Sequence, residues 1–259
     1  MKDNEITMEE KENKEKKKFT GKPSIDHPHW QWYPEESYLT EVPKLKAYDY
    51  MKQRNEAYLN DVVLRYFGRK ITYREFFKKI DETEKALLSL GVKENDIVTV
   101  MGVNSPEIVY LFYALNKMNA IPNMIDPRTK PVGIKMYLNE VQSRHLFMLN
   151  MCYSAVTPII KETGLKKVVV LSPNDSLPLG VKQIKALKDH QDKKKGELPN
   201  IKYNDIFLSW STFIRGGRKT IYVPTAPYRE NTTACIVHTG GTTGTPKGVE
   251  LTNENLNAM

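Results

Sequence analysis

Four short apolar runs, separated from one another by stretches with helical signals, are the feature that most limits how this chain can fold. Each run has the length of a buried strand, and helix-capping or polar residues lie between consecutive runs. The runs occupy residues 97–101, 120–125, 145–149 and 167–171. Because strand and helix alternate with short connections, the sequence predicts an α/β fold with a mostly parallel sheet flanked by helices.

Capping residues define two of the predicted helices. Thr72 and Glu75 have the spacing of a capping box, and Gly91 is placed to end the helix that they open. Ser105 is placed to cap the next helix, with Pro106 at its first position. The residues predicted to face the core are Phe76, Ile80, Thr83 and Leu87 in the first helix, and Val109, Phe112 and Leu115 in the second.

The remaining segments give further expectations. Residues 62–67 and 70–73 are predicted to form a hairpin turning at Gly68, and residues 132–141, 155–162 and 204–214 are predicted to form helices. Pro122 suits an edge strand or a strand end. Residues 172–200 are polar and rich in lysine, so we expect a surface excursion there, with a solvated helix or loop from residue 182.

Residues 238–249 read His-Thr-Gly-Gly-Thr-Thr-Gly-Thr-Pro-Lys-Gly-Val and lie between two strand-like runs. Glycines let backbone N–H groups approach an anion, threonine hydroxyls donate hydrogen bonds, and Lys247 supplies a positive charge. The stretch therefore predicts a loop that binds a polyphosphate, although a flexible linker containing a lysine is the alternative. Its candidate binding residues are Thr239, Gly240, Gly241, Thr242, Thr243, Gly244, Thr245 and Lys247.

The spacing matches neither the common P-loop nor Gly-x-Gly-x-x-Gly. The stretch resembles instead the phosphate-loop signature of the adenylate-forming (AMP-binding) superfamily, which includes acyl-CoA synthetases, luciferases and the adenylation domains of peptide synthetases. That signature is approximately Tyr-Thr-Ser/Gly-Gly-Thr-Thr-Gly-x-Pro-Lys-Gly-Val. Weaker resemblances precede it in the family's order, so that the similarity covers about residues 28–259. They lie at residues 70–76, 90–96, 104–107 and 119–127.

Two details resemble long-chain fatty acyl-CoA synthetases in particular. They are the Gly240-Gly241 pair and the Trp-x-x-Tyr-Pro pattern of residues 30–34. The sequence departs from the family pattern at His238, where tyrosine is common, and at Asn253, where histidine typically follows the loop. We interpret His238, at the end of an apolar strand, as a packed or hydrogen-bonded histidine rather than a catalytic base.

The resemblance implies a two-step reaction. A carboxylate attacks the α-phosphorus of ATP to give acyl-AMP and pyrophosphate, and the thiol of coenzyme A then displaces AMP. The loop would hold the β- and γ-phosphates, with Mg²⁺ sharing that task. The family's adenine, ribose and metal contacts and its carboxylate-contacting lysine lie beyond residue 259. We therefore expect an incomplete N-terminal part of the large domain of a fatty-acid–CoA ligase, inactive alone, with no catalytic or metal-binding residue of its own.

Other classes of function stay open beside this one. The chain could be a non-catalytic module that binds a nucleotide or a partner, or part of an adenylating enzyme for an aryl or amino-acid carboxylate. A nucleic-acid-binding protein is disfavoured, although the net charge is +8. Residues 1–22 hold seven lysines against six acids, and no aromatic residues alternate with the basic ones. The charge favours solubility and a mild attraction for anionic ligands or a membrane surface.

Composition sets the last expectations. Residues 1–25 are predicted to be a disordered charged leader without the apolar segment of a secretion signal, and residues 26–259 to be the adenylation-domain part. No apolar run is long enough to span a bilayer. Cys152 and Cys235 lack metal-binding or redox spacing, which favours a reducing, cytoplasmic location.

Overall fold

The computed structural model describes residues 20–22, 26, 30, 32, 41–220, 227–239 and 247–259. The chain divides into one unit of residues 1–42 and another of residues 43–259, which holds every element named below. In the first unit, Thr20 donates to the Asp26 carboxylate from its amide and its hydroxyl, each at 2.9 Å. Almost all of the predicted leader lies outside the described residues. No helix in the described part is long and apolar enough to cross a membrane.

A mostly parallel sheet forms the centre of the second unit, and this confirms the predicted fold class. Within the described ranges it has seven strands in the order β7-β6-β5-β3-β4-β8-β9, and only β9 runs antiparallel to its neighbour. A separate antiparallel hairpin of β1 and β2 turns at Gly68, as predicted. The strands are β1 (Val62–Tyr66), β2 (Arg69–Thr72), β3 (Ile97–Met101), β4 (Ile121–Ile125), β5 (His145–Leu149), β6 (Lys167–Leu171), β7 (Phe207–Ser209), β8 (Thr233–His238) and β9 (Gly248–Thr252).

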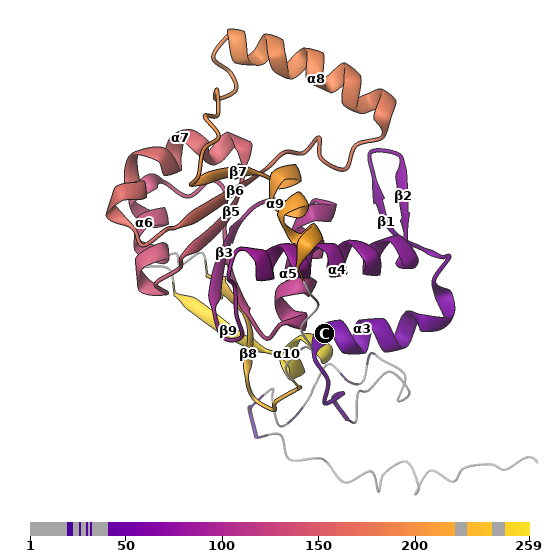
Figure 1. Cartoon of the computed structure of the whole chain (residues 1–259). Helices are drawn as coiled ribbons and strands as arrows, with labels where there is room; N and C mark the ends of the chain where they lie inside the picture. The colour runs from indigo at the N-terminus through magenta and orange to yellow at the C-terminus, as the bar shows by residue number, and fades with distance from the viewer. Residues whose placement is uncertain are drawn as a thin grey trace, which may run out of the picture. The chain divides into compact units, whose positions relative to one another are not determined.

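Helices cover both faces of the sheet (Figure 1). One face packs against α4, α5 and α9 around Phe76, Leu111 and Phe213, and the other packs against α6 and α7 around Ile134 and Leu138. The helices are α3 (Ala47–Asn55), α4 (Tyr73–Ser89), α5 (Pro106–Lys117), α6 (Pro131–Glu140), α7 (Tyr153–Val156), α8 (Leu179–Lys194), α9 (Trp210–Gly216) and α10 (Asn253–Asn257), with short 3₁₀ turns η3 (Glu56–Tyr58), η4 (Asn150–Cys152), η5 (Thr157–Glu162) and η6 (Gly217–Lys219).

The start of α4 confirms the predicted cap but not the full capping box. The Thr72 hydroxyl accepts a hydrogen bond from the Glu75 amide at 3.4 Å. The Glu75 carboxylate does not return to the Thr72 backbone, because it pairs with Arg69 on the neighbouring hairpin. All four predicted core residues of α4 are buried, and Gly91 follows the helix with a φ of 83°.

The predicted buried face of α5 is displaced. Leu115 is buried, but Val109 and Phe112 are only half-buried, and Ile108 and Leu111 point into the core instead. The helix is apolar on nearly every side, so its sequence offers little contrast between faces. Ser105 precedes the helix in an extended conformation, but its side chain makes no capping hydrogen bond.

Strand β4 is an interior strand between β3 and β8, so the prediction of an edge position is wrong. The alternative, a strand end, fits, because Pro122 is the second residue of β4. The amide of Ile121 donates to Asp96 beside β3, so the next nitrogen, that of Pro122, faces β8. Pairing with β8 begins only at Asn123, and the missing N–H of proline therefore interrupts no ladder hydrogen bond.

Two other predictions need correction. Residues 155–162 do not form one α-helix: α7 ends at Val156 and continues as the 3₁₀ turn η5, whose Pro158 has no N–H to donate. Residues 204–214 do not form one helix either, because residues 207–209 pair with β6 as strand β7 before α9 begins. The predicted solvated helix within residues 172–200 is α8, and none of its described side chains is buried.

The short helix α10 is tied to the first half of the chain by Asn253, the residue at which the sequence departs from the family pattern. Asn253 is buried, and its side-chain oxygen accepts from the Ala47 amide at 3.0 Å and from the Asn116 side chain at 2.8 Å. An amide oxygen can accept both bonds because it has two lone pairs. Asn253 thus joins α10, α3 and α5.

Candidate nucleotide-phosphate site

The carboxyl ends of β3, β4 and β8 meet at one edge of the sheet, because these three strands are adjacent and parallel. The chain leaves them through Gly102, Asp126 and Thr239. Strand β3 lies between β4 and β5 in the sheet. The connection that follows β3 leads to the strand on one side of it, and the next connection leads to the strand on the other side. In open α/β sheets, ligands bind outside the carboxyl ends of the strands at such a switch point. The predicted phosphate loop therefore starts at the edge where the topology favours a ligand.

Thr239 and Lys247 flank the predicted loop and are hydrogen-bonded to each other. The Thr239 amide donates to the Lys247 carbonyl at 3.0 Å, and the Lys247 amide lies 3.4 Å from the Thr239 hydroxyl oxygen. This pair extends the antiparallel ladder of β8 and β9 by one step beyond His238 and Gly248. Both residues are exposed. The other predicted site residues, Gly240, Gly241, Thr242, Thr243, Gly244 and Thr245, lie outside the described residues.

A row of polar side chains crosses three strands behind this edge. His238 Nε2 on β8 lies 2.7 Å from Asn123 Oδ1 on β4, and Asn123 Nδ2 donates to Thr99 Oγ1 on β3 at 3.2 Å. Asn123 and Thr99 are completely buried. Because the Asn123 oxygen can only accept, His238 carries its proton on Nε2. Burial lowers the pKa of His238, which favours this neutral form.

His238 is therefore confirmed as a packed and hydrogen-bonded residue. Its ring lies against Tyr137 of α6, with 4.1 Å between the ring centroids. A Cβ atom at Gly248 would lie 3.2 Å from Ile236 Cγ2, which is a tight contact, and 3.5 Å from His238 Cε1, which is an ordinary one, so a larger residue there would press on Ile236 first. These contacts fix the end of β8 from which the loop departs.

An exposed ion pair follows β4 at the same edge. Asp126 accepts from the Arg128 amide at 2.8 Å and from the Arg128 guanidinium Nε at 3.0 Å. The hydrogen bonds from Arg128 lower the pKa of Asp126 to about 2, so this carboxylate is ionised at neutral pH. Asp126 balances the charge of Arg128 locally. Lys247 is the cation within the predicted loop itself.

The described residues do not supply a metal site or a thiolate. Magnesium prefers oxygen ligands, usually carboxylates. No group of three His, Cys, Asp or Glu side chains capable of holding a metal ion occurs in the described part. Cys152 and Cys235 are buried and unpaired, and burial raises the pKa of each thiol to about 11.

Sequence reasoning missed the hydrogen-bonded row behind the loop. Asn123 and His238 are 115 positions apart, and only the fold shows that they meet. One local signal was available: Asn123 and Thr99 are polar residues inside strand-like apolar runs, and a buried polar side chain needs a partner.

A model of the AMP-binding enzyme family matches residues 51–259. The chain belongs to this family. A probable acyl-activating enzyme of Arabidopsis thaliana is 24% identical over 79% of this chain and 36% of its own length. A long-chain-fatty-acid–CoA ligase of Bacillus subtilis (strain 168) is 23% identical over 74% of this chain and 33% of its own length. The chain thus spans about a third of the length of these curated relatives.

Comparison with solved structures supports the same fold. An anthranilate CoA ligase in complex with anthranoyl-AMP superposes with a TM-score of 0.65 at 20% sequence identity, over 82% of this chain and 36% of that one. The likeness confirms the predicted architecture, a mostly parallel sheet flanked by helices that matches the N-terminal part of adenylate-forming enzymes.

Proposed function

We propose that this chain provides the phosphate loop of an ATP-dependent carboxylate–CoA ligase, and that residues 239–247 hold the β- and γ-phosphates while acyl-AMP forms. The observation that carries this proposal is the pairing of Thr239 with Lys247 at the carboxyl edge of an AMP-binding fold. Such a pairing brings together the two ends of a segment whose glycines, threonines and lysine suit an anion.

The chemistry assigned to these residues is electrostatic. When a carboxylate oxygen bonds to the α-phosphorus of ATP, the bond from that phosphorus to the bridging oxygen of pyrophosphate breaks. Negative charge then increases on the departing pyrophosphate, and donors already aimed at it stabilise the transition state. We assign this role to the Lys247 ammonium, the threonine hydroxyls and the backbone N–H groups of the loop. The hydrogen bond between His238 and Asn123 would keep β8, the strand that leads into the loop, in place.

A fatty acid is our proposed carboxylate. The Gly240-Gly241 pair, the aromatic pattern of residues 30–34 and the similarity to a long-chain-fatty-acid–CoA ligase support it. The similarity to an anthranilate CoA ligase keeps an aryl acid as the alternative. Coenzyme A as the acceptor, Mg²⁺ as the counter-ion of ATP and a cytoplasmic location are further parts of the proposal that rest on the family resemblance and on the two free thiols.

The test is pyrophosphate release from ATP with a panel of palmitate, benzoate, anthranilate and free amino acids. It should be run on the 259-residue chain and on the longest product of its gene. Carboxylate-dependent release that is strongest with palmitate is the expected result for the ligase. Saturable ATP binding without release by either protein would favour the non-catalytic nucleotide-binding module. A wild-type rate of pyrophosphate release by the Lys247→Ala variant would contradict the role given to the loop.

A further inference from the structure

Helix α8 lies at the periphery of the second unit (Figure 1). None of its described side chains is buried, and none of them packs against either cluster of buried core residues. Most helices of a globular domain are held in place by an apolar side that faces the core. The apolar residues of α8 therefore need another explanation.

These apolar residues form a stripe on the side of α8 that faces solvent. The stripe consists of Val181, Ile184 and Leu187, which are 43%, 72% and 71% exposed, and residues three apart lie on the same side of a helix. Asp189 points to the other side, where it accepts a hydrogen bond from Asn174 in the turn after β6. The Asp189 side chain is only 16% exposed. Helix α8 thus contacts the domain through the Asp189 side and presents the apolar stripe outward.

Lysines surround the apolar stripe. Residues 179–195 contain six lysines against two aspartates, a net charge of +4. Lys188 and Lys194 extend from the same side as the stripe, because they follow Ile184 and Leu187 by one and two helical turns. Both lysines are exposed, and neither forms an ion pair with a described residue. The outer side of α8 therefore combines aliphatic side chains with unbalanced positive charge.

This combination favours an anionic lipid surface over a second copy of the chain. A second copy would bring its own lysines against these, and three aliphatic side chains form a smaller patch than the about 800 Å² that each partner of a stable complex buries. On a bilayer, the aliphatic side chains can enter the boundary between headgroups and acyl chains, while the lysines extend their ammonium groups to the lipid phosphates. Clusters of about four to eight lysines or arginines on an amphipathic helix are typical of binding to anionic lipids.

We propose that α8 is an interfacial helix, which binds the protein reversibly to a membrane that contains anionic lipids. The helix lies along the surface of the bilayer, with Ile184 and Leu187 inserted and with Lys188 and Lys194 beside lipid phosphates. This inference does not depend on the proposed ligase activity, because α8 contributes no residue to the phosphate loop.

The experiment is flotation of the purified protein with vesicles of phosphatidylcholine alone and with vesicles that also contain about 30 mol% phosphatidylglycerol. The protein should bind the anionic vesicles at least about tenfold more tightly than the neutral ones. Most of this preference should disappear when the NaCl concentration rises from about 0.1 M to about 0.5 M, because salt screens exposed charges. No binding, or equal binding to both kinds of vesicle, would overturn the proposal.

A first pair of variants tests the apolar stripe. Ile184→Gln/Leu187→Gln keeps the charge and suits a helix, and it should weaken binding to the anionic vesicles at least about tenfold. The matched control is Val132→Gln/Met151→Gln, which removes two exposed apolar side chains from α6 and η4 and should bind like wild type. Wild-type binding by Ile184→Gln/Leu187→Gln would refute the assignment to α8.

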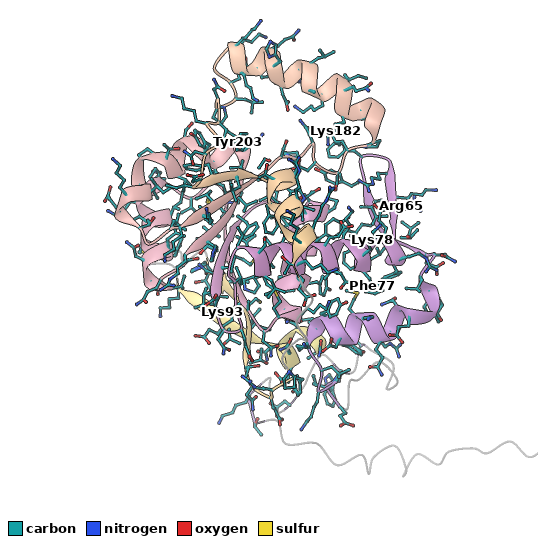
Figure 2. All side chains as sticks on the ribbon, in the orientation of Figure 1. Arg65, Phe77, Lys78, Lys93, Lys182 and Tyr203 are labelled. Carbon is teal, nitrogen blue, oxygen red and sulfur yellow. The ribbon has the colours of Figure 1, made fainter. Side chains whose placement is uncertain are left out.

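A second pair of variants separates the local charge of α8 from the net charge of the protein. Lys188→Gln/Lys194→Gln should weaken binding to the anionic vesicles about tenfold or more. The control Lys78→Gln/Lys93→Gln removes the same charge from two exposed lysines of α4 and the turn before β3, both labelled in Figure 2, and should have little effect. Equal losses in the two variants would overturn the proposal.

Analytical ultracentrifugation tests the competing occupant, a second copy of the chain. The protein should not dimerise through α8. A concentration-dependent dimer that Ile184→Gln/Leu187→Gln abolishes would show that a second copy covers the stripe, and it would overturn the membrane assignment.

Discussion

The backbone amide of Thr239 donates to the carbonyl of Lys247 over 3.0 Å, one step beyond the last pair of the β8–β9 ladder. This bond sets the separation of the two ends of the predicted phosphate loop by backbone geometry alone. The Lys247 side chain takes no part in it and is exposed. Its function can therefore be removed by mutation while the ladder is left intact.

Lys247→Ala should lower the rate of adenylation far more than it lowers stability. Truncating an exposed lysine usually changes the free energy of unfolding by under about 0.5 kcal/mol. Losing one contact to the charge that develops in the transition state typically costs on the order of 2–4 kcal/mol, a factor of roughly 30 to 1,000 in rate. Lys247→Arg should restore only part of the rate, because the planar guanidinium of arginine does not occupy the same position as the compact ammonium of lysine.

Thermal melts and single-turnover acyl-AMP formation, measured on the gene product that releases pyrophosphate, check this prediction. A wild-type adenylation rate for Lys247→Ala at saturating ATP and magnesium would show that Lys247 is not a transition-state contact.

Lys117→Met should be strongly destabilising. The Lys117 ammonium lies 2.7 Å from carboxylate oxygens of both Asp81 and Glu84, and the Glu84 side chain is only 1% exposed. Removing the cation leaves a buried charge uncompensated, which costs about 3–5 kcal/mol. In urea unfolding, the double variant Lys117→Met/Glu84→Leu should recover most of that loss. A double variant as unstable as Lys117→Met would contradict this explanation.

Gly217→Ala should destabilise the contact between η6 and α4. A Cβ atom at Gly217 would lie 2.5 Å from the Ala86 nitrogen and 2.7 Å from its Cα, and these backbone atoms cannot move aside easily. Overpacking of this kind costs roughly 1–3 kcal/mol. Gly180→Ala is the matched control, because its Cβ meets nothing within 4 Å and alanine is preferred to glycine within a helix. Equal melting temperatures for the two variants would disprove the packing argument.

Asp175→Asn should stabilise the protein at neutral pH but not in acid. Burial is the main factor that raises the pKa of Asp175, from 3.8 to about 6. Because the folded state holds this proton more tightly than the unfolded state, stability falls as the pH rises from about 4 to 6 and then stays low. Asparagine has no proton to lose and can still accept the bond from the Ser172 amide.

Urea unfolding at pH 4 and pH 7.5 measures this effect. The variant should gain on the order of 1–3 kcal/mol over wild type at pH 7.5, since one unit of pKa shift corresponds to about 1.4 kcal/mol. The same difference between variant and wild type at both pH values would mean that Asp175 does not titrate as described.

The sequence predicted an element well where its apolar residues differ clearly from the polar or capping residues beside them. Strands β3, β5 and β6 were predicted to the residue, because each is an apolar run between polar or capping residues. Strand β7 was missed, since its three residues are defined by pairing with β6 and its aromatic spacing also fits a helix. The buried face of α5 was predicted wrongly, because a helix that is apolar on nearly every side shows no periodic alternation of apolar and polar residues.

The candidate site was predictable only where its residues are consecutive. The chemistry of residues 239–247 can be inferred from one short stretch, because glycine, threonine and lysine act there as a group. The bonds from His238 to Asn123 and from Asn123 to Thr99 join three separate strands, and no local pattern encodes them.

The position of Asn253 has a consequence for biosynthesis. Its contact with Ala47 spans 206 positions, so α3 lacks one of its hydrogen-bond partners until almost all of the described chain has emerged from the ribosome. Closing so large a segment is an entropic cost that local contacts cannot offset early. In a nascent chain, α3 can therefore pack against α5 through the bond from the Tyr48 amide to Asn116 well before residue 253 emerges, and only the bond to Asn253 closes late.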